Sequence, residues 1–157
     1  MSYDFNADDV FQMAEQIERN GAAFYRKAAS DVADADARAF LLDLAAMEDD
    51  HEKIFSSMRK KISDQEKTPT VFDPENEAAA YLKALADTRV FFDKEIDTAS
   101  LQAILKAAIL AEKDSIVFYL GMKELVPDAL GQSRLDDIMK EEMAHIKLLS
   151  RRLVATR

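Results

Sequence analysis

Apolar residues recur every three or four positions over four long stretches of the chain, as they do on the buried face of an amphipathic helix. The stretches run from Ala7 to about Val32, from Asp34 or Asp36 to about Ile62, from Leu101 to a turn bracketed by Pro127 and Gly131, and on through Leu135 to Leu153. The pattern therefore predicts four helices of roughly 25 residues each.

The segments between these stretches predict how the helices are joined. Asn6 is a candidate N-cap, followed by two aspartates in the positive first turn of the first helix. Residues 63–70 form a polar connector, and Asp73-Pro74 predicts a short helix that ends near Ala86. Two helical hairpins joined by a long crossover with a short helix describe an all-α four-helix bundle. The length of 157 residues suits one domain, so we expect 1–157 to fold as a single domain.

The two predicted hairpins are similar to each other in sequence. At an offset of 94, residues 18–56 align with 112–150 without a gap, and 12 of the 39 aligned positions are identical. We interpret this as duplication of a hairpin, and convergence of two amphipathic hairpins on one pattern is the alternative. Duplication predicts an approximate internal two-fold axis, with equivalent residues facing each other across it.

Composition narrows the classes of function. The chain has 30 acidic and 21 basic residues, a net charge of −9, which argues against nucleic acid and anionic membrane surfaces as partners. It has no Cys, which excludes disulfides, iron–sulfur clusters, thiolate zinc sites and cysteine nucleophiles. No apolar run reaches 18 residues, and the first residues lack a basic segment followed by an apolar one. We therefore expect a cytoplasmic protein without a membrane span.

The candidate chemistry lies at the only two histidines of the chain. Each has a glutamate three residues before it, in Glu48-x-x-His51 and Glu142-x-x-His145. Residues i and i+3 share one face of a helix, so a carboxylate and an imidazole can bind the same cation. A further glutamate lies 30 residues upstream of each motif, at Glu18 and Glu112. One glutamate from each of two helices and a Glu-x-x-His from each of the others form the recurrent di-metal carboxylate site of bundle cores.

Charge and ligand type indicate which metals suit such a site. Four glutamates carry −4 and two divalent ions carry +4, so a site with neutral histidines is neutral overall. Without metal, four glutamates in a bundle core are costly to ionise, and some take up protons. Oxygen and imidazole ligands without sulfur suit iron or manganese. We predict two iron ions per chain, with manganese or zinc as alternatives.

The alternative interpretation of these motifs is a solvated helix face, where glutamate and histidine are common. The repetition of the motif and its apolar neighbours, such as Leu44 and Phe55, favour a buried metal site instead. Four nearby acidic residues are expected to face water: Asp49, Asp50, Glu52 and Glu141. Five methionines are expected to fill the core: Met13, Met47, Met122, Met139 and Met143.

Tyr25 and Tyr119 each follow a candidate ligand by seven residues, which is about two helical turns. They therefore share a helix face with Glu18 and Glu112 and are positioned to hydrogen-bond ligating carboxylates. We assign both tyrosines as candidate catalytic residues beside the metals. The alternative is that each is a core tyrosine whose hydroxyl lies at a helix seam.

These segments resemble the ferritin-like superfamily and, within it, the di-iron domain of the rubrerythrin family. The resemblance rests on residues 18–25, 48–51, 111–119 and 141–145, and it extends over nearly the whole chain. It implies a ferritin-like fold, a di-iron site, an oxidative role toward peroxide or dioxygen and, often, a homodimer.

The sequence departs from typical rubrerythrins in two ways. Such proteins carry a rubredoxin domain whose iron is held by four cysteines, and this chain has none. Electrons would come from a separate donor, such as a rubredoxin-like protein, or directly from ferrous iron. Rubrerythrins also tend to have a second glutamate three residues after the ligand of the third helix, where this chain has Ser115. The plain site of four glutamates and two histidines is expected instead.

The first functional hypothesis is a di-iron oxidoreductase that reduces hydrogen peroxide. Its predicted ligand roles are bridging for Glu48 and Glu142, terminal for Glu18 and Glu112, and one histidine per metal, His51 and His145. The second hypothesis is iron handling, with ferroxidase turnover against dioxygen. The third is a bundle whose metals, such as zinc or manganese, only stabilise the fold.

Overall fold

The computed structural model describes residues 7–62, 80, 84, 98, 100–125 and 132–156. Four long helices account for most of them: α1 Ala7–Asp31, α2 Ala35–Lys60, α4 Leu101–Leu125 and α5 Gln132–Ala155. The described residues contain no strand, and none of their helices is long and apolar enough to cross a membrane. The all-α prediction is confirmed, and the helix ends lie within a few residues of the predicted ones. The predicted cap at Asn6, the turn at Pro127 and Gly131, and most of the helix over 74–86 lie outside the described residues.

Side chains that accept hydrogen bonds from free backbone N–H groups explain where two helices begin. The carboxylate of Asp34 accepts from the N–H of Ala37 at 2.8 Å and caps α2. The hydroxyl of Ser100 accepts from the N–H of Ala103 at 3.2 Å, directly before α4. These two short polar side chains therefore fix the first turns of the helices that carry half of the candidate ligands.

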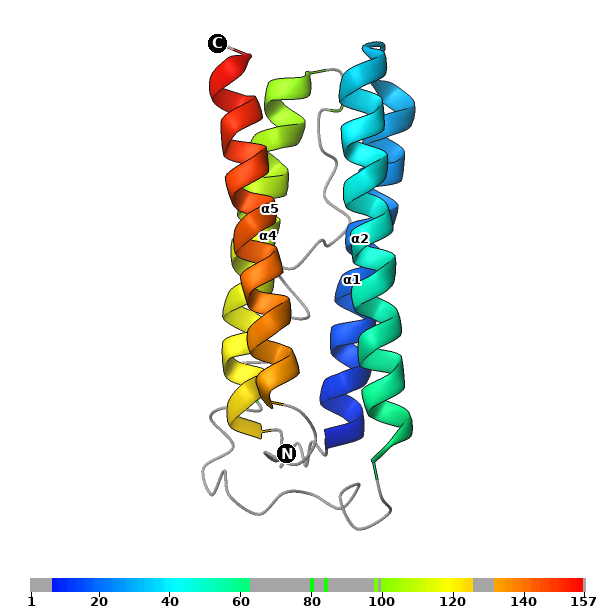
Figure 1. Ribbon diagram of the computed structural model, residues 1–157, viewed down its shortest axis with the longest axis vertical. Helices are drawn as coiled ribbons and strands as arrows, with labels where there is room; N and C mark the ends of the chain where they lie inside the picture. The colour runs from blue at the N-terminus through cyan, green and yellow to red at the C-terminus, as the bar shows by residue number, and fades with distance from the viewer. Residues whose placement is uncertain are drawn as a thin grey trace.

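The helices pack as two antiparallel pairs that lie side by side along the long axis of the molecule (Figure 1). α1 packs against α2, α4 packs against α5, and α1 also contacts α4 between the pairs. α2 and α4 run in the same direction, so the end of α2 and the start of α4 lie at opposite ends of the bundle. This is the order of a four-helix bundle with one long crossover, as predicted.

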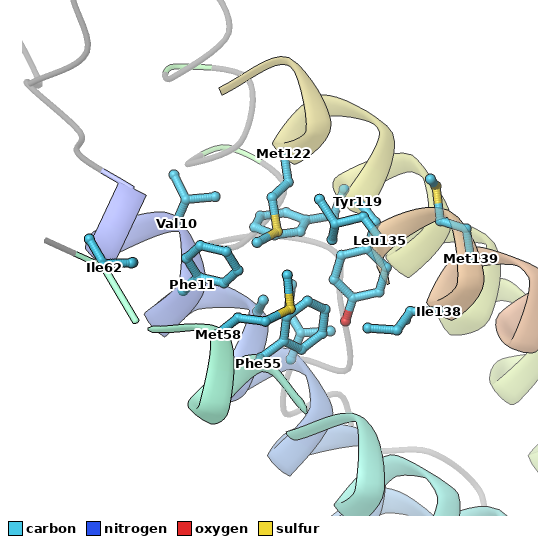
Figure 2. Packing of buried hydrophobic residues seen from close by; sticks show 13 residues of the cluster. Val10, Phe11, Phe55, Met58, Ile62, Tyr119, Met122, Leu135, Ile138 and Met139 are labelled. Atoms are coloured by element: carbon cyan, nitrogen blue, oxygen red, sulfur yellow. The ribbon is translucent and has the colours of Figure 1, made fainter. Parts of the chain in front are cut away.

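Buried apolar side chains form two clusters, one on either side of the candidate ligands. The Phe55 cluster consists of the buried apolar residues within 10–17, 55–62, 118–122 and 135–139. The Leu41 cluster consists of the buried apolar residues within 25–32, 37–45 and 104–108, together with Leu149. On each helix the candidate ligands fall between the two clusters in sequence. Figure 2 shows the aromatic rings of Phe11, Phe55 and Tyr119 within the Phe55 cluster. Apolar layers therefore bound the ligands at both ends.

The predicted role of the methionines is partly wrong. Met122 and Met139 are buried in the Phe55 cluster, and Met13 packs against it. Met47 and Met143, however, are 40% and 55% exposed. Each of these two is adjacent in sequence to a buried glutamate, and neighbouring residues on a helix point about 100° apart. The glutamates take the buried direction, so these methionines turn toward the surface.

Candidate metal centre

All six candidate ligands lie in the interior of the bundle, and each of the four long helices contributes at least one. None of them is more than 3% exposed. They are Glu18 on α1, Glu48 and His51 on α2, Glu112 on α4, and Glu142 and His145 on α5. The i,i+3 spacing in α2 and α5 places each histidine on the same face as its glutamate, as the sequence predicts.

The ligand atoms form two groups that share two carboxylates. Within each group, one nitrogen or oxygen atom per residue lies within 4.8 Å of the others. The first group is Glu18, Glu48, His51 and Glu142, and the second is Glu48, Glu112, Glu142 and His145. Each group thus holds one histidine, one glutamate of its own and two shared glutamates. The structure brings together all six residues that the sequence singles out as ligands.

The shared glutamates reach both histidines with different oxygen atoms. In Glu142, Oε1 lies 2.9 Å from Nδ1 of His51 and Oε2 lies 3.2 Å from Nδ1 of His145. In Glu48, Oε2 lies 3.5 Å from Nδ1 of His51 and Oε1 lies 3.7 Å from Nδ1 of His145. A carboxylate placed in this way can bind one cation with each oxygen, which is what a bridging ligand does.

The unshared glutamates each lie beside one histidine. An oxygen of Glu18 is 3.5 Å from Nδ1 of His51, and an oxygen of Glu112 is 3.5 Å from Nδ1 of His145. The two imidazole rings are nearly parallel, 19° apart, with their centroids separated by 5.7 Å. This arrangement is consistent with the predicted terminal roles and with one histidine for each of two cations.

The two tyrosines hydrogen-bond carboxylates of the opposite repeat. The hydroxyl of Tyr25 on α1 donates to Oε1 of Glu112 on α4 at 2.5 Å. The hydroxyl of Tyr119 on α4 donates to Oε1 of Glu18 on α1. The sequence predicts that the tyrosines meet ligating carboxylates, and the structure shows that each does so across the bundle rather than along its own helix. Both rings are fully buried, so the bonds hold Glu18 and Glu112 in fixed orientations.

We expect Tyr25→Phe to destabilise the metal-free protein by about 1–3 kcal/mol, because the buried Glu112 loses a hydrogen-bond donor. Urea unfolding of metal-free protein measures this loss. The matched control is the same change in a Glu112→Gln background, where the interaction energy between the two positions can be isolated. An equal loss in both backgrounds would show that the stabilisation by the Tyr25 hydroxyl does not depend on the carboxylate of Glu112.

Burial makes the carboxylates of the metal-free site hard to ionise. It raises the pKa of Glu142 to about 8, helped by the negative charges of Glu112 and Glu48. Burial and the charge of a neighbouring glutamate also raise the pKa values of Glu18 and Glu48. The metal-free site therefore retains protons on carboxylates that would be ionised in water.

Glu112 and the two histidines are shifted toward their charged forms. Burial alone would raise the pKa of Glu112, but its close contacts with Glu142 and His145 and the hydrogen bond from Tyr25 hold it at about 2. Burial opposes protonation of His145, yet the carboxylates of Glu112 and Glu142 beside its ring raise its pKa to about 10. The pKa of His51 is raised in the same way by the carboxylates around it. In the metal-free site, the positive charge of the two protonated histidines therefore balances part of the negative charge of the glutamates.

Buried polar atoms at the centre of the site indicate whether these residues suit metal ions. Several buried atoms have no hydrogen-bond partner among the described residues: Oε1 of Glu48, Nδ1 of His51, Oε2 of Glu112, both carboxylate oxygens of Glu142, and Nδ1 of His145. Buried polar atoms without partners are rare and costly, and all of these belong to the candidate ligands. Oxygen and imidazole nitrogen are the donor types that iron and manganese accept, so the residues fit two divalent ions.

Ser115 occupies the position where the resemblance would place a further carboxylate. It is buried, and its hydroxyl donates to the backbone oxygen of Ala111 at 3.0 Å, one turn earlier on α4. The hydroxyl is thereby engaged by its own helix rather than by the ligands. The expected plain set of four glutamates and two histidines is the set that the structure places together.

One polar neighbour of the site, Glu141, does not follow from the sequence pattern. Glu141 was expected to face water, and its side chain is indeed 59% exposed, but Oε2 lies 2.6 Å from Nε2 of His51. At the equivalent position of the other repeat, Sδ of Met47 lies 3.1 Å from Nε2 of His145. The offset of 94 residues pairs these two positions, but it does not show that each contacts the histidine of the opposite motif. Glu52, also expected to face water, is partly buried and pairs with Arg19 at 2.6 Å.

Comparisons with known proteins show the family and the fold of this chain. The chain matches the family model described as Rubrerythrin over residues 9–153. Its fold is similar to that of a Thermotoga maritima protein provisionally assigned as a ferritin-like diiron-carboxylate protein, with a TM-score of 0.72, 20% sequence identity and 100% of each chain covered. Among curated protein sequences, none matches significantly. At 20% identity the structural likeness shows the ferritin-like fold, and the family match spans most of the chain. This protein therefore belongs to the rubrerythrin family.

Proposed function

We propose that this protein binds two iron ions and reduces hydrogen peroxide with electrons from a separate donor. The observation that supports the proposal most directly is the geometry of Glu48 and Glu142, each of which presents one oxygen to each histidine. Carboxylates shared in this way would hold two cations as neighbours, so that a single oxidant could reach both. When bound, two ferrous ions supply the two electrons that convert hydrogen peroxide and two protons into two water molecules.

The residues divide into ligands and groups that hold the ligands. Glu18, Glu48, His51 and Glu142 would hold one ion, and Glu48, Glu112, Glu142 and His145 the other. Tyr25 and Tyr119 fix the two unshared carboxylates by hydrogen bonds. The Phe55 and Leu41 clusters on either side limit the access of water along the bundle axis.

The absence of Cys from these residues bears on how the iron would be reduced between turnovers. The 157 residues contain no Cys, so they include no rubredoxin-type iron site held by thiolates. We propose that a donor outside these residues, for which a rubredoxin-like protein is suitable, reduces the iron between turnovers.

A second candidate function for the same cluster of glutamates and histidines is a ferroxidase that uses dioxygen. In that case incoming ferrous iron is itself the electron donor, and the product is ferric iron that must leave the site. Both functions use the same six ligands, and they differ in the oxidant and in the number of irons consumed per chain.

Anaerobic titration of metal-free protein with ferrous iron, followed by separate mixing with peroxide and dioxygen, distinguishes these functions. We expect binding to saturate at two irons per chain and absorbance changes to be faster with peroxide than with dioxygen. Faster reaction with dioxygen and continued uptake beyond two irons would instead support the ferroxidase. A stable complex without any redox response would indicate that the metals only stabilise the bundle.

The matched control for this titration is Asp50→Asn. Asp50 is exposed, lies on α2 two residues from Glu48 and pairs only loosely with Lys53, at 3.5 Å. The change removes one negative charge near the site but no ligand atom. Iron stoichiometry and the order of the two rates should therefore match those of the unmodified protein.

A further inference from the structure

The outward-facing nitrogens of the two histidines have different partners. In both rings Nδ1 faces the shared carboxylates, at 2.9 Å from Glu142 for His51 and 3.2 Å for His145. Nε2 of His51 lies 2.6 Å from the carboxylate of Glu141. Nε2 of His145 lies 3.1 Å from the thioether sulfur of Met47. The two halves of the site therefore match in their ligands and differ in the group behind each histidine.

This difference occurs at equivalent positions of the internal repeat. Residues 47 and 141 are 94 apart, and each directly precedes the glutamate of a Glu-x-x-His motif. Each also contacts the histidine of the opposite motif rather than its own. An approximate two-fold thus relates the two contacts, and the substitution of a thioether for a carboxylate is what breaks it.

The two acceptors have different effects on an imidazole that binds a cation. A histidine that gives Nδ1 to a metal must carry its proton on Nε2. A carboxylate accepts that proton in a strong, charge-assisted hydrogen bond, which fixes the tautomer and ring orientation and makes Nδ1 more basic. A thioether is only a weak acceptor, so it fixes the ring less firmly and leaves Nδ1 less basic.

We propose that Glu141 is a positioning residue for His51, and that it makes the two metal positions unequal, with the His51 position binding a divalent ion more tightly than the His145 position. The proposal rests on the two-metal site proposed above, but not on the identity of the oxidant. It concerns the order in which the positions fill and which of them is retained when metal is scarce.

Cobalt(II) titration of single-position variants tests this without any measurement of activity. His145→Ala leaves the His51 position, and His51→Ala leaves the His145 position; the visible absorption bands of bound cobalt report occupancy in each. In the His145→Ala background we expect Glu141→Met to weaken cobalt binding about 10- to 100-fold. In the His51→Ala background the same change should have little effect. Glu141→Gln, which keeps a neutral oxygen acceptor, should give an intermediate loss.

The reciprocal substitution tests the other half of the site. Met47→Glu places a carboxylate at the position equivalent to Glu141, and in the His51→Ala background it should tighten cobalt binding. In the His145→Ala background it should not. Asp137→Asn is the matched control, because Asp137 is exposed on α5 one turn before Glu141 and has the same charge. It should leave both backgrounds unchanged, and circular dichroism of the metal-free variants confirms that each remains folded.

The outcomes separate this proposal from the proposed function. Equal weakening by Glu141→Met in both backgrounds, or a matching loss with Asp137→Asn, would show a general effect of charge and overturn the proposal. No change with Glu141→Met in the His145→Ala background would also overturn it. If the unmodified protein fails to bind two cobalt ions, the two-metal site itself is wrong and the proposal fails with it.

Discussion

Glu142→Gln is expected to weaken the binding of both metal ions, whereas Glu112→Gln should weaken the binding of one. The two oxygens of Glu142 face different histidines, at 2.9 and 3.2 Å, while Glu112 belongs to the second group of ligands. Leaving buried charges without a partner costs about 3–5 kcal/mol, so the affinity at each affected position should fall at least about 100-fold. Equilibrium dialysis with metal analysis measures both positions.

The stability of metal-free Glu142→Gln distinguishes loss of a shared ligand from unfolding of the bundle. Glutamine keeps the size and shape of glutamate, and it removes a carboxylate whose pKa burial raises to about 8. The metal-free Glu142→Gln protein should therefore melt no earlier than the unmodified protein. Retention of one tightly bound ion in Glu142→Gln would contradict the bridging role, and so would loss of both ions in Glu112→Gln.

The second large effect is on the pH dependence of stability. Between pH 5 and 9 the melting temperature of the metal-free protein should fall by at least about 5 °C. Folding raises the pKa of Glu142 from an ordinary value of 4.5 to about 8, and that of His145 from 6.5 to about 10. Both groups bind protons more tightly in the folded state, so their contribution is complete at low pH and is lost as the pH rises through the folded values.

Metal should reverse this trend, because the ligands must release their protons to bind cations. The gain in melting temperature on adding ferrous iron, manganese or cobalt should therefore grow as the pH increases from 5 to 9. Differential scanning calorimetry with and without metal gives both curves. Glu112 does not alter the prediction, since its pKa is lowered to about 2 and its titration lies below this range.

Glu142→Gln is also the control for the pH experiment. It removes one of the groups whose pKa values are raised in the folded state, so the metal-free curve should become flatter. A melting temperature that rises from pH 5 to 9 without metal would contradict the assignment of protons to Glu142 and His145. An unchanged slope in Glu142→Gln would show that Glu142 does not contribute to the trend.

Much of the fold and of the candidate site could be predicted from the sequence. Residue spacing along each helix determines which side chains share a face, and the same Glu-x-x-His spacing occurs in both halves of the chain. Helical periodicity around Leu41 and Phe55 determines which face of α2 is buried, and the spacing from Glu48 to His51 places both on that face. Repetition of the same spacing at Glu142 separates a ligand set from a chance pair. The four helices, the crossover order and the six clustered residues follow from these patterns.

Contacts between helices could not be predicted in the same way. Helical spacing tells which residues share a face, but the sequence does not give the rotation and axial position of one helix against the next. Those decide that Tyr25 meets Glu112 rather than Glu18, and that each oxygen of Glu142 faces a different histidine. They also decide that Met47 is turned partly to the surface.

Glu141 shows most clearly what residue spacing along one helix cannot predict. By itself the sequence determined that this residue lies about 100° around α5 from Glu142, and hence away from the buried face. Only the tertiary structure brings α2 close enough for the exposed carboxylate to reach Nε2 of His51 at 2.6 Å. The sequence thus determined which residues are candidate ligands, because the residues that share a face of one helix are set by local spacing. The packing of α5 against its neighbours decided which groups support those ligands, because that depends on distances between helices.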